Sequence, residues 1–131
     1  MKLLVDIVSK NGNLLLSVPL RADGTFDEKE EKILNEFGNW MNINKEAIYQ
    51  TRPWKIFGEG PIADKDVQLN AQGFNEWAYS KADAKEIRFT QTDKNLYATV
   101  LGWPEDGKIL IRSLAEGNGL YPTKIGRVEL L

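Results

Sequence analysis

The sequence predicts an α+β fold, with a helix–strand–helix unit over residues 1–50 and an antiparallel β-sandwich over residues 51–131. Two observations predict this order. In the first half, apolar residues recur at helical spacing on either side of a short aliphatic run, whereas the second half has short apolar runs separated by turn sequences. One strand between two helices is not a closed fold, and the second half has too few strands for two full sheets. We therefore expect a truncated sandwich and a fragment of a larger protein.

The first element is predicted to be a helix that ends at Asn11-Gly12. Apolar residues recur at helical spacing between Leu3 and Val8, and the Asn-Gly pair supplies a left-handed terminus. The run from Asn13 to Val18 is rich in leucine and lacks polar alternation. Such a run predicts a strand that is buried on both faces, as in a parallel sheet.

A second helix is predicted from about Asp27 to Met41. Thr25 and Glu28 have the spacing of a capping box, and acidic residues in the first turn stabilise the positive end of the helix dipole. The helix carries one apolar stripe, which consists of Ile33, Leu34, Phe37, Trp40 and Met41. A stripe of this size needs a larger partner surface than one strand offers.

The second half follows a domain junction, which is predicted at Thr51–Trp54 and Gly58–Pro61 because prolines and glycines cluster there. Turns are expected at Asp93–Asn95 and at Pro104–Gly107. Short strands with regular turn signals are typical of an antiparallel sandwich or barrel. The predicted strands are Ile87–Thr90, Leu96–Leu101, Lys108–Arg112 and Ile125–Leu131.

The composition excludes several classes of function. The chain has 131 residues, of which 17 are basic and 19 acidic, and the net charge of −2 argues against a nucleic-acid or anionic-membrane partner. Histidine and cysteine are absent, so the chain itself supplies no imidazole base, thiol nucleophile or zinc site. No apolar run approaches the ~18 residues of a membrane span. Because Asp6 interrupts the signal-like start, we expect a soluble chain without a signal peptide, of unknown compartment.

Two motifs have the form of ligand-binding loops, but each has a simpler interpretation. Gly102–Lys108 has the spacing of a phosphate-binding loop, yet Ile109 stands where that loop needs a hydroxyl, so we expect a hairpin turn. Asp64-Lys65-Asp66, with Glu59 nearby, has carboxylates that suit calcium, although a solvated loop is more common. We expect no metal and no cofactor. A basic cluster is interpreted as a solvated face and consists of Lys81, Lys85 and Arg88.

Three tryptophans and one serine are further candidates for a binding role. Trp54, Trp77 and Trp103 lie in or beside the β-rich half. Their flat aromatic faces can stack on sugar rings, but burial in a core is the more common role, and we expect it here. Ser17 lies at the end of the predicted buried strand, which is where parallel-barrel enzymes carry their chemistry.

A longer pattern runs through the whole chain. It starts with the thirteen residues from Leu4 to Leu16, which read LVDIVSKNGNLLL. It continues, in order, through Asp23–Thr25, Asn44–Tyr49, Thr51–Trp54, Ile87–Thr90, Leu96–Ala98, Leu101–Pro104 and Val128–Leu131. In this succession the chain resembles the alpha-L-fucosidases of glycoside hydrolase family twenty-nine. The ordered succession is far more specific than any single motif.

The resemblance implies a (β/α)8-like barrel that hydrolyses alpha-L-fucosides with retention, and a C-terminal β-sandwich packed against it. By resemblance, Met1–Gly12 is the end of a late barrel helix, Asn13–Val18 the last barrel strand and Asp27–Met41 the last barrel helix. The family's aspartate nucleophile and glutamate acid/base lie upstream of this stretch, so no catalytic residue is carried over. The sequence Ser17–Leu20 departs from the common Asn-containing end of this strand, which leaves the substrate preference open.

The sequence thus predicts a fragment of an alpha-L-fucosidase-like glycoside hydrolase that is inactive alone. Its predicted partners are fucosylated glycans, bound through the complete enzyme, and other copies of the same fragment. Ser17 is the candidate substrate-binding residue. Two alternatives remain open: a carbohydrate-binding β-sandwich in which Trp103 contacts the sugar, and a structural or interaction domain. The sequence upstream of Met1 would distinguish an enzyme fragment from a free-standing module.

Overall fold

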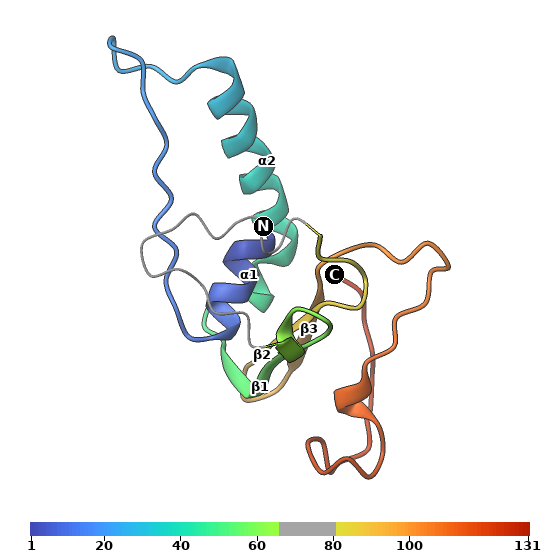
Figure 1. Ribbon diagram of the computed structural model, residues 1–131. Helices are drawn as coiled ribbons and strands as arrows, with labels where there is room; N and C mark the ends of the chain where they lie inside the picture. Colours follow the sequence, from blue (N-terminus) through green and yellow to red (C-terminus); the bar gives the residue numbers. More distant parts are fainter. Residues whose placement is uncertain (66–80) are drawn as a thin grey trace.

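The computed structural model describes residues 1–65 and 81–131, and these form two α-helices and one three-stranded antiparallel sheet. Figure 1 shows α2 projecting away from the sheet, with α1 near its base. Neither helix of the described part is long and apolar enough to cross a membrane. In chain order the elements are α1 (Lys2–Ser9), α2 (Glu28–Asn44), the 3-10 turn η1 (Lys45–Ala47), β1 (Arg52–Glu59), η2 (Ala63–Lys65), β2 (Ile87–Gln91), β3 (Leu96–Val100) and η3 (Arg112–Leu114).

The central strand of the sheet is β2, which pairs antiparallel with β1 on one side and with β3 on the other. The pairing of β2 with β3 is regular and places Ile87 opposite Val100. The turn between them is closed by a hydrogen bond from the Thr92 N–H to the Asn95 carbonyl. These two strands and their turn confirm the prediction from the sequence.

The first strand, β1, forms within the stretch that the sequence marks as a junction, where no strand is predicted. Pro53 is tolerated because β1 is an edge strand and its missing N–H breaks no pairing with a further strand. The register shifts between Pro53 and Gly58, as in a β-bulge. At Gly58 an added β-carbon would lie 2.5 Å from the Ile87 carbonyl oxygen, so the close approach of the two strands requires glycine.

Both faces of β2 are covered, by different parts of the chain. Ile87 and Phe89 lie in a core with Trp54, whose ring meets that of Phe89 edge-on at a centroid distance of 5.0 Å. Side chains of the C-terminal segment pack against this core. On the other face, the Thr90 hydroxyl donates a 2.7 Å hydrogen bond to the Ala47 carbonyl. The alternation of apolar and polar residues in β2 therefore does not mark a solvent-facing side.

The first helix, α1, confirms the prediction for the N-terminus and packs on a small core. Val5 contacts Ala82 and Leu101 there, and Trp40 of α2 packs against the same cluster. Trp40 thus attaches the base of α2 to α1. No residue of α2 is fully buried, because the rest of the helix extends beyond this contact.

A buried ion network also joins α1 to the sheet. The Arg88 guanidinium lies 2.5 Å from the carboxylate of Asp6 and 3.0 Å from that of Glu86, and all three side chains are at most 3% exposed. Lys10 pairs with the second oxygen of Asp6 at 2.8 Å. The interpretation of Arg88 as part of a solvated face is wrong, because the adjacent carboxylates compensate its charge inside the fold. The other two members of that predicted cluster are exposed, Lys81 and Lys85.

The segment between the two helices contradicts the predicted strand over Asn13–Val18. It carries no strand, and Figure 1 shows it running as an extended stretch to the tip from which α2 returns. Leu15 is 95% exposed and Leu16 50% exposed. A parallel strand needs hydrogen-bonding neighbours, and the described residues supply none for this segment.

The second helix starts where the sequence predicts but uses a different cap. Asp27 is the N-cap, and its carboxylate accepts hydrogen bonds from the backbone N–H groups of Lys29 (2.7 Å) and Glu30 (3.1 Å). Thr25, the predicted capping residue, instead donates its hydroxyl to Asp23 at 2.7 Å. The prediction of a helix is confirmed, whereas the capping box is wrong because Asp27 stands closer to the first helical N–H groups.

This cap predicts a pH optimum for the start of α2. A side-chain hydrogen bond with Glu30 lowers the pKa of Asp27 below its usual 3.8, so the cap stabilises the helix above that pH and is lost as pH falls through the lowered pKa. The same bond raises the pKa of Glu30 above 4.5, and its contribution is lost as pH rises through the raised pKa. Helix content measured by circular dichroism should therefore peak between the two pKa values.

The substitution Glu30→Gln separates these two contributions. The glutamine amide can donate to Asp27 at every pH, so the decline of helix content on the alkaline side should disappear while the acid decline remains. Glu36→Gln, on an exposed turn of the same helix, is the matched control and should keep both declines. An unchanged alkaline decline in Glu30→Gln would contradict the hydrogen bond between the protonated Glu30 carboxyl and Asp27.

Beyond β3 the chain has no further strand in the described residues, so the strands predicted at Lys108–Arg112 and Ile125–Leu131 do not form. The segment is held instead by η3 and by a hydrogen bond from the Lys55 ammonium to the Leu120 carbonyl at 2.7 Å. These apolar runs find no hydrogen-bonding neighbour among the described residues. The second sheet of the predicted sandwich stays a prediction.

Candidate functional site

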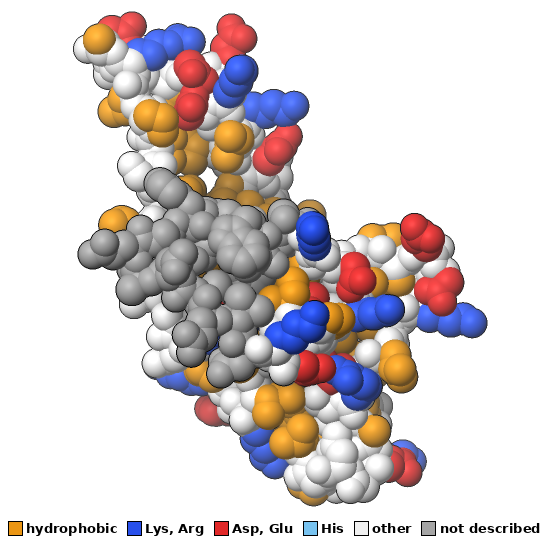
Figure 2. Space-filling model, viewed as in Figure 1, with side chains coloured by type: hydrophobic (Ala, Val, Ile, Leu, Met, Phe, Trp, Pro, Cys, Tyr) orange, Lys and Arg blue, Asp and Glu red, His pale blue; other side chains and the backbone are white. Residues whose placement is uncertain are grey.

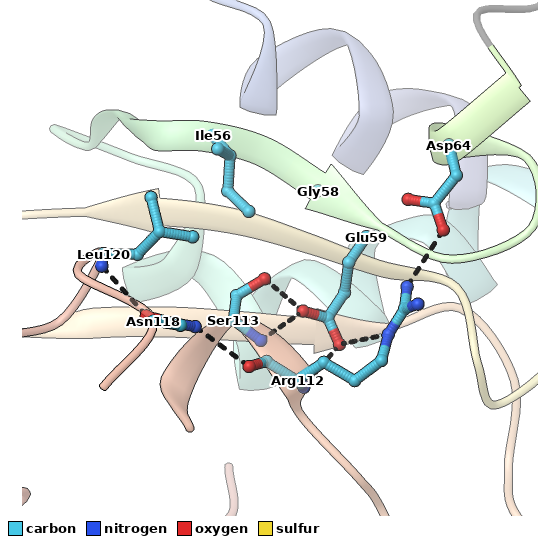
Figure 3. Close-up of a pocket in the computed structure, with 8 residues that line it drawn as sticks. All are labelled: Ile56, Gly58, Glu59, Asp64, Arg112, Ser113, Asn118 and Leu120. Carbon is cyan, nitrogen blue, oxygen red and sulfur yellow. Dashed lines mark hydrogen bonds and ion pairs between the residues drawn. The ribbon is translucent and has the colours of Figure 1, made fainter. Parts of the chain in front are cut away.

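The end of β1 borders a cavity of about 400 Å³. Figure 3 shows Glu59 of β1, Asp64 of η2, and Arg112 and Ser113 of η3 converging there. The other lining residues are Ile56, Gly58, Asn118 and Leu120. The cavity is therefore built from two elements that are adjacent in the sequence, β1 and η2, and from the distant η3.

Glu59 is the central acid of this cavity and is only 5% exposed. One of its carboxylate oxygens accepts the backbone N–H of Arg112 at 2.8 Å. The other accepts the backbone N–H of Ser113 at 2.7 Å and also the Ser113 hydroxyl. Backbone donors of this kind compensate a buried carboxylate and leave both of its oxygens engaged. Glu59 thus anchors η3 to the end of β1.

Arg112 links Glu59 to a second acid. Its guanidinium lies 3.0 Å from the carboxylate of Asp64 and 3.8 Å from that of Glu59. The hydrogen bond and the charge of Asp64 raise the pKa of Arg112. Because Arg112 and Asp64 are more than half exposed, their ion pair adds little stability by itself. It does hold a cation and a carboxylate side by side at the mouth of the cavity.

This arrangement suits binding better than acid–base catalysis. Retaining glycoside hydrolysis requires one carboxyl group that donates a proton and one carboxylate that attacks the sugar. Both oxygens of Glu59 accept hydrogen bonds, and Asp64 is paired with Arg112. Neither acid is therefore free to act as a proton donor or nucleophile. The exposed Arg112 guanidinium and Asp64 carboxylate, in contrast, can bind polar groups of a ligand.

A larger depression of about 820 Å³ adjoins this cavity and shares Glu59, Asp64 and Arg112 with it. Its far wall is formed by residues 83–85 and by residues 103–110, which include Trp103. Trp103 is 79% exposed. The depression thus joins a polar cluster to an exposed aromatic side chain.

The structure separates the two residues that the sequence singles out for substrate binding. Ser17 is exposed on the segment between α1 and α2 and lines neither of these two cavities. Trp103 lines the larger one. The role of each stays a prediction.

The three tryptophans of the β-rich half differ in their environments. Trp54 is buried in the core, as the sequence predicts. The prediction of burial is wrong for Trp103, which is 79% exposed and belongs to neither core cluster of the described residues. Trp77 lies outside the described residues.

Of the two loop motifs, Gly102–Lys108 contains the predicted turn, but the prediction of a hairpin is wrong because no strand follows the turn among the residues described. Pro104–Gly107 is a turn, closed by a hydrogen bond from the Gly107 N–H to the Pro104 carbonyl, and irregular chain follows it. Asp64 pairs with Arg112, whereas Asp66 lies outside the described residues. In the described part of the chain, no group of acidic side chains is arranged to hold a metal ion.

Three residues of the cavity are not predicted from the sequence: Arg112, Ser113 and Asn118. Glu59 and Ser113 are 54 residues apart, so no local pattern links them. The available signal is the charge of Glu59 shortly after the stretch Trp54–Phe57, in which three of the four side chains are apolar. A carboxylate in that position indicates a specific buried partner but does not identify it.

Comparisons with known proteins agree over most of the chain. A family model described as alpha-L-fucosidase matches residues 1–46. The tissue alpha-L-fucosidase of Rattus norvegicus is 30% identical over 84% of this chain and 19% of its own length. The plasma alpha-L-fucosidase of Homo sapiens is 32% identical over the same shares. The alpha-L-fucosidase of Dictyostelium discoideum is 30% identical over 94% of this chain and 22% of its own length.

A solved structure agrees with these relatives. The crystal structure of Thermotoga maritima alpha-fucosidase, in complex with a mechanism-based inhibitor, superposes on 76% of this chain and 19% of that chain with a TM-score of 0.55 and 31% identity. This chain thus spans about a fifth of the length of the curated relatives that it matches. Because the matches extend from the helical first half into the sheet, the chain belongs to the alpha-L-fucosidase family.

Proposed function

We propose that this chain is the C-terminal part of a retaining glycoside hydrolase that removes alpha-L-fucose from glycans. Residues 1–50 would supply the last helix–strand–helix portion of the catalytic barrel, and residues 51–131 the start of the C-terminal β-sandwich. The observation that carries the proposal is the match to alpha-L-fucosidases over 84–94% of this chain but only 19–22% of theirs. A segment of this size would complete the enzyme without containing its whole site.

The exposed apolar surface of the first half supports this proposal. Leu15 and Leu16 are 95% and 50% exposed, and Ile33 on α2 is 59% exposed. Figure 2 shows hydrophobic side chains among charged ones on the arm that α2 forms. Large apolar side chains gathered on an extended segment and an adjoining helix are typical of a surface that a neighbouring structure covers. In the proposed enzyme, the neighbouring strands and helices of the barrel cover it.

The chain alone should therefore not hydrolyse a chromogenic alpha-L-fucoside above background. Retaining hydrolysis needs two carboxyl groups about 5 Å apart on one site. By resemblance these groups lie upstream, and the buried acid of the described cavity, Glu59, accepts hydrogen bonds on both oxygens.

A continuous spectrophotometric assay of the purified chain checks this expectation, with an active alpha-L-fucosidase of full length as the positive control. Turnover that is abolished by Glu59→Gln or Asp64→Asn, but kept by the exposed-site variant Glu46→Gln, would show that the chain carries its own catalytic acids. That result would contradict the proposed division of the enzyme.

A further inference from the structure

The larger depression presents an aromatic platform beside a mixed set of charges. It encloses about 820 Å³ between the end of β1, residues 83–85 and residues 103–110. That volume falls within the range of small-molecule sites, about 300–1,000 Å³. Trp103 lines it and is 79% exposed, whereas Trp54 of the core is 9% exposed.

Trp103 is exposed although the backbone on both sides of it is held. At Gly102 a β-carbon would lie 2.7 Å from the Asp83 carbonyl carbon, so this residue packs directly on the neighbouring backbone. Pro104, on the other side, is buried. An exposed tryptophan on a backbone that is packed on both sides offers its ring to a ligand, and little backbone freedom is lost on binding.

The polar walls carry both signs of charge. The Arg112 guanidinium lies 3.0 Å from the Asp64 carboxylate, and the Asp83 carboxylate accepts the backbone N–H of Lys85 at 2.8 Å. Residues 105–108 add two acidic side chains, Glu105 and Asp106, and one basic side chain, Lys108, and Figure 2 shows acidic and basic side chains close together on the lobe that Figure 1 colours orange. An ion of either sign would meet like charges here, whereas a neutral ligand with many hydroxyl groups finds donors and acceptors together.

We infer that this depression is a binding subsite for a neutral glycan, separate from the hydrolytic centre of the proposed enzyme. The apolar C–H face of one pyranose ring stacks on the Trp103 indole, whose face carries the negative part of the ring quadrupole. Hydroxyl groups of the same or the next sugar bind the Asp83 carboxylate and the Arg112 guanidinium. The inference deepens the proposed function, on which it rests for the identity of the glycan as part of the enzyme's substrate.

Titration of the chain with neutral oligosaccharides tests the inference. The probes are a fucosylated oligosaccharide, the same oligosaccharide without fucose, an amino-sugar oligomer that is cationic and a uronic-acid oligomer that is anionic. We expect saturable heat or fluorescence changes with both neutral probes and weaker binding of the two charged ones. Added salt should leave the neutral affinities unchanged, because no net charge is neutralised.

Substitutions of Trp103 test whether the glycan binds at its indole ring. Trp103→Ala should weaken the neutral affinities by about three- to tenfold, the size of one aromatic contact, and Trp103→Phe should recover part of the loss. Tyr49→Ala, which removes another exposed aromatic ring outside the depression, is the matched control and should bind as the parent chain does. Circular dichroism verifies that each variant is folded.

Three results would overturn the inference: no saturable binding of either neutral probe, equal affinity in Trp103→Ala, or tightest binding of a charged oligomer. These results leave the proposed function standing, because hydrolysis by the longer protein is measured separately. Conversely, glycan binding at Trp103 in a protein whose longer form has no fucosidase activity would refute only the proposed function.

Discussion

Arg88→Met is expected to lower the stability of the fold severely. Arg88 is 1% exposed at the side chain and lies between Asp6 of α1 at 2.5 Å and Glu86 at 3.0 Å. Methionine has a similar length but no charge, so it leaves two carboxylates buried without the guanidinium. Removal of one member of a buried ion network costs about 3–5 kcal/mol, which is comparable with the whole stability of many domains, about 5–15 kcal/mol.

Urea unfolding followed by circular dichroism measures this loss. The midpoint should fall sharply in Arg88→Met or no folded baseline should remain, whereas Arg21→Met, at an exposed arginine, should unfold as the parent chain does. The triple variant Arg88→Met, Asp6→Leu, Glu86→Leu tests whether buried carboxylates cause the loss of stability, because it removes the Asp6 and Glu86 carboxylates as well. If the single variant keeps the parent midpoint, the network does not join α1 to the sheet.

Association of the chain with itself at micromolar concentration is the second large effect that we expect. Leu15 and Leu16 are exposed, as is Ile33, and burial of each side chain is worth roughly 1.5–3 kcal/mol. The outer edges of β1 and β3 pair with no further strand among the described residues, and such edges favour pairing between chains. Together the free energies of apolar burial and of strand pairing can exceed the entropic cost of association.

Light scattering should therefore give a mass above 14.9 kDa that falls towards this value on dilution. The double variant Leu15→Ser, Leu16→Ser removes two of the exposed side chains and should raise the dissociation constant by at least about tenfold. Asn13→Ser, at an exposed polar position of the same segment, is the control and should associate as before. A mass of 14.9 kDa at every concentration, without binding of a dye for exposed apolar surface, would contradict this prediction.

Local patterns predict the elements whose stabilising contacts are themselves local. The helical spacing around Leu3 and Val8 predicts α1, the acidic first turn and apolar stripe predict α2, and the turn at Asp93–Asn95 places β2 and β3 correctly. The strand β1 is missed because Pro53 and Gly58 indicate a junction, whereas an edge position and a bulge accommodate both.

The remaining differences depend on neighbours that local patterns cannot supply. The aliphatic run Asn13–Val18 has the composition of a buried parallel strand, but a strand forms only where another offers its N–H and C=O groups. Arg88 alternates with apolar residues like a solvent-facing residue, and its burial is explained by the Asp6 carboxylate from α1 together with the neighbouring Glu86 carboxylate. The contacts of Glu59 with η3 likewise join distant segments, so the cavity could not be foreseen.

The central claim is that this chain completes a fucoside-hydrolysing enzyme. The most direct test expresses the gene from the reading frame upstream of Met1 through Leu131 and assays hydrolysis of a chromogenic alpha-L-fucoside, with and without residues 1–131. We expect the longer product to hydrolyse the fucoside with retention of anomeric configuration, and the product that lacks these residues to lose activity or fail to fold. A stop codon directly upstream of Met1, or a longer product without fucosidase activity, would contradict the claim.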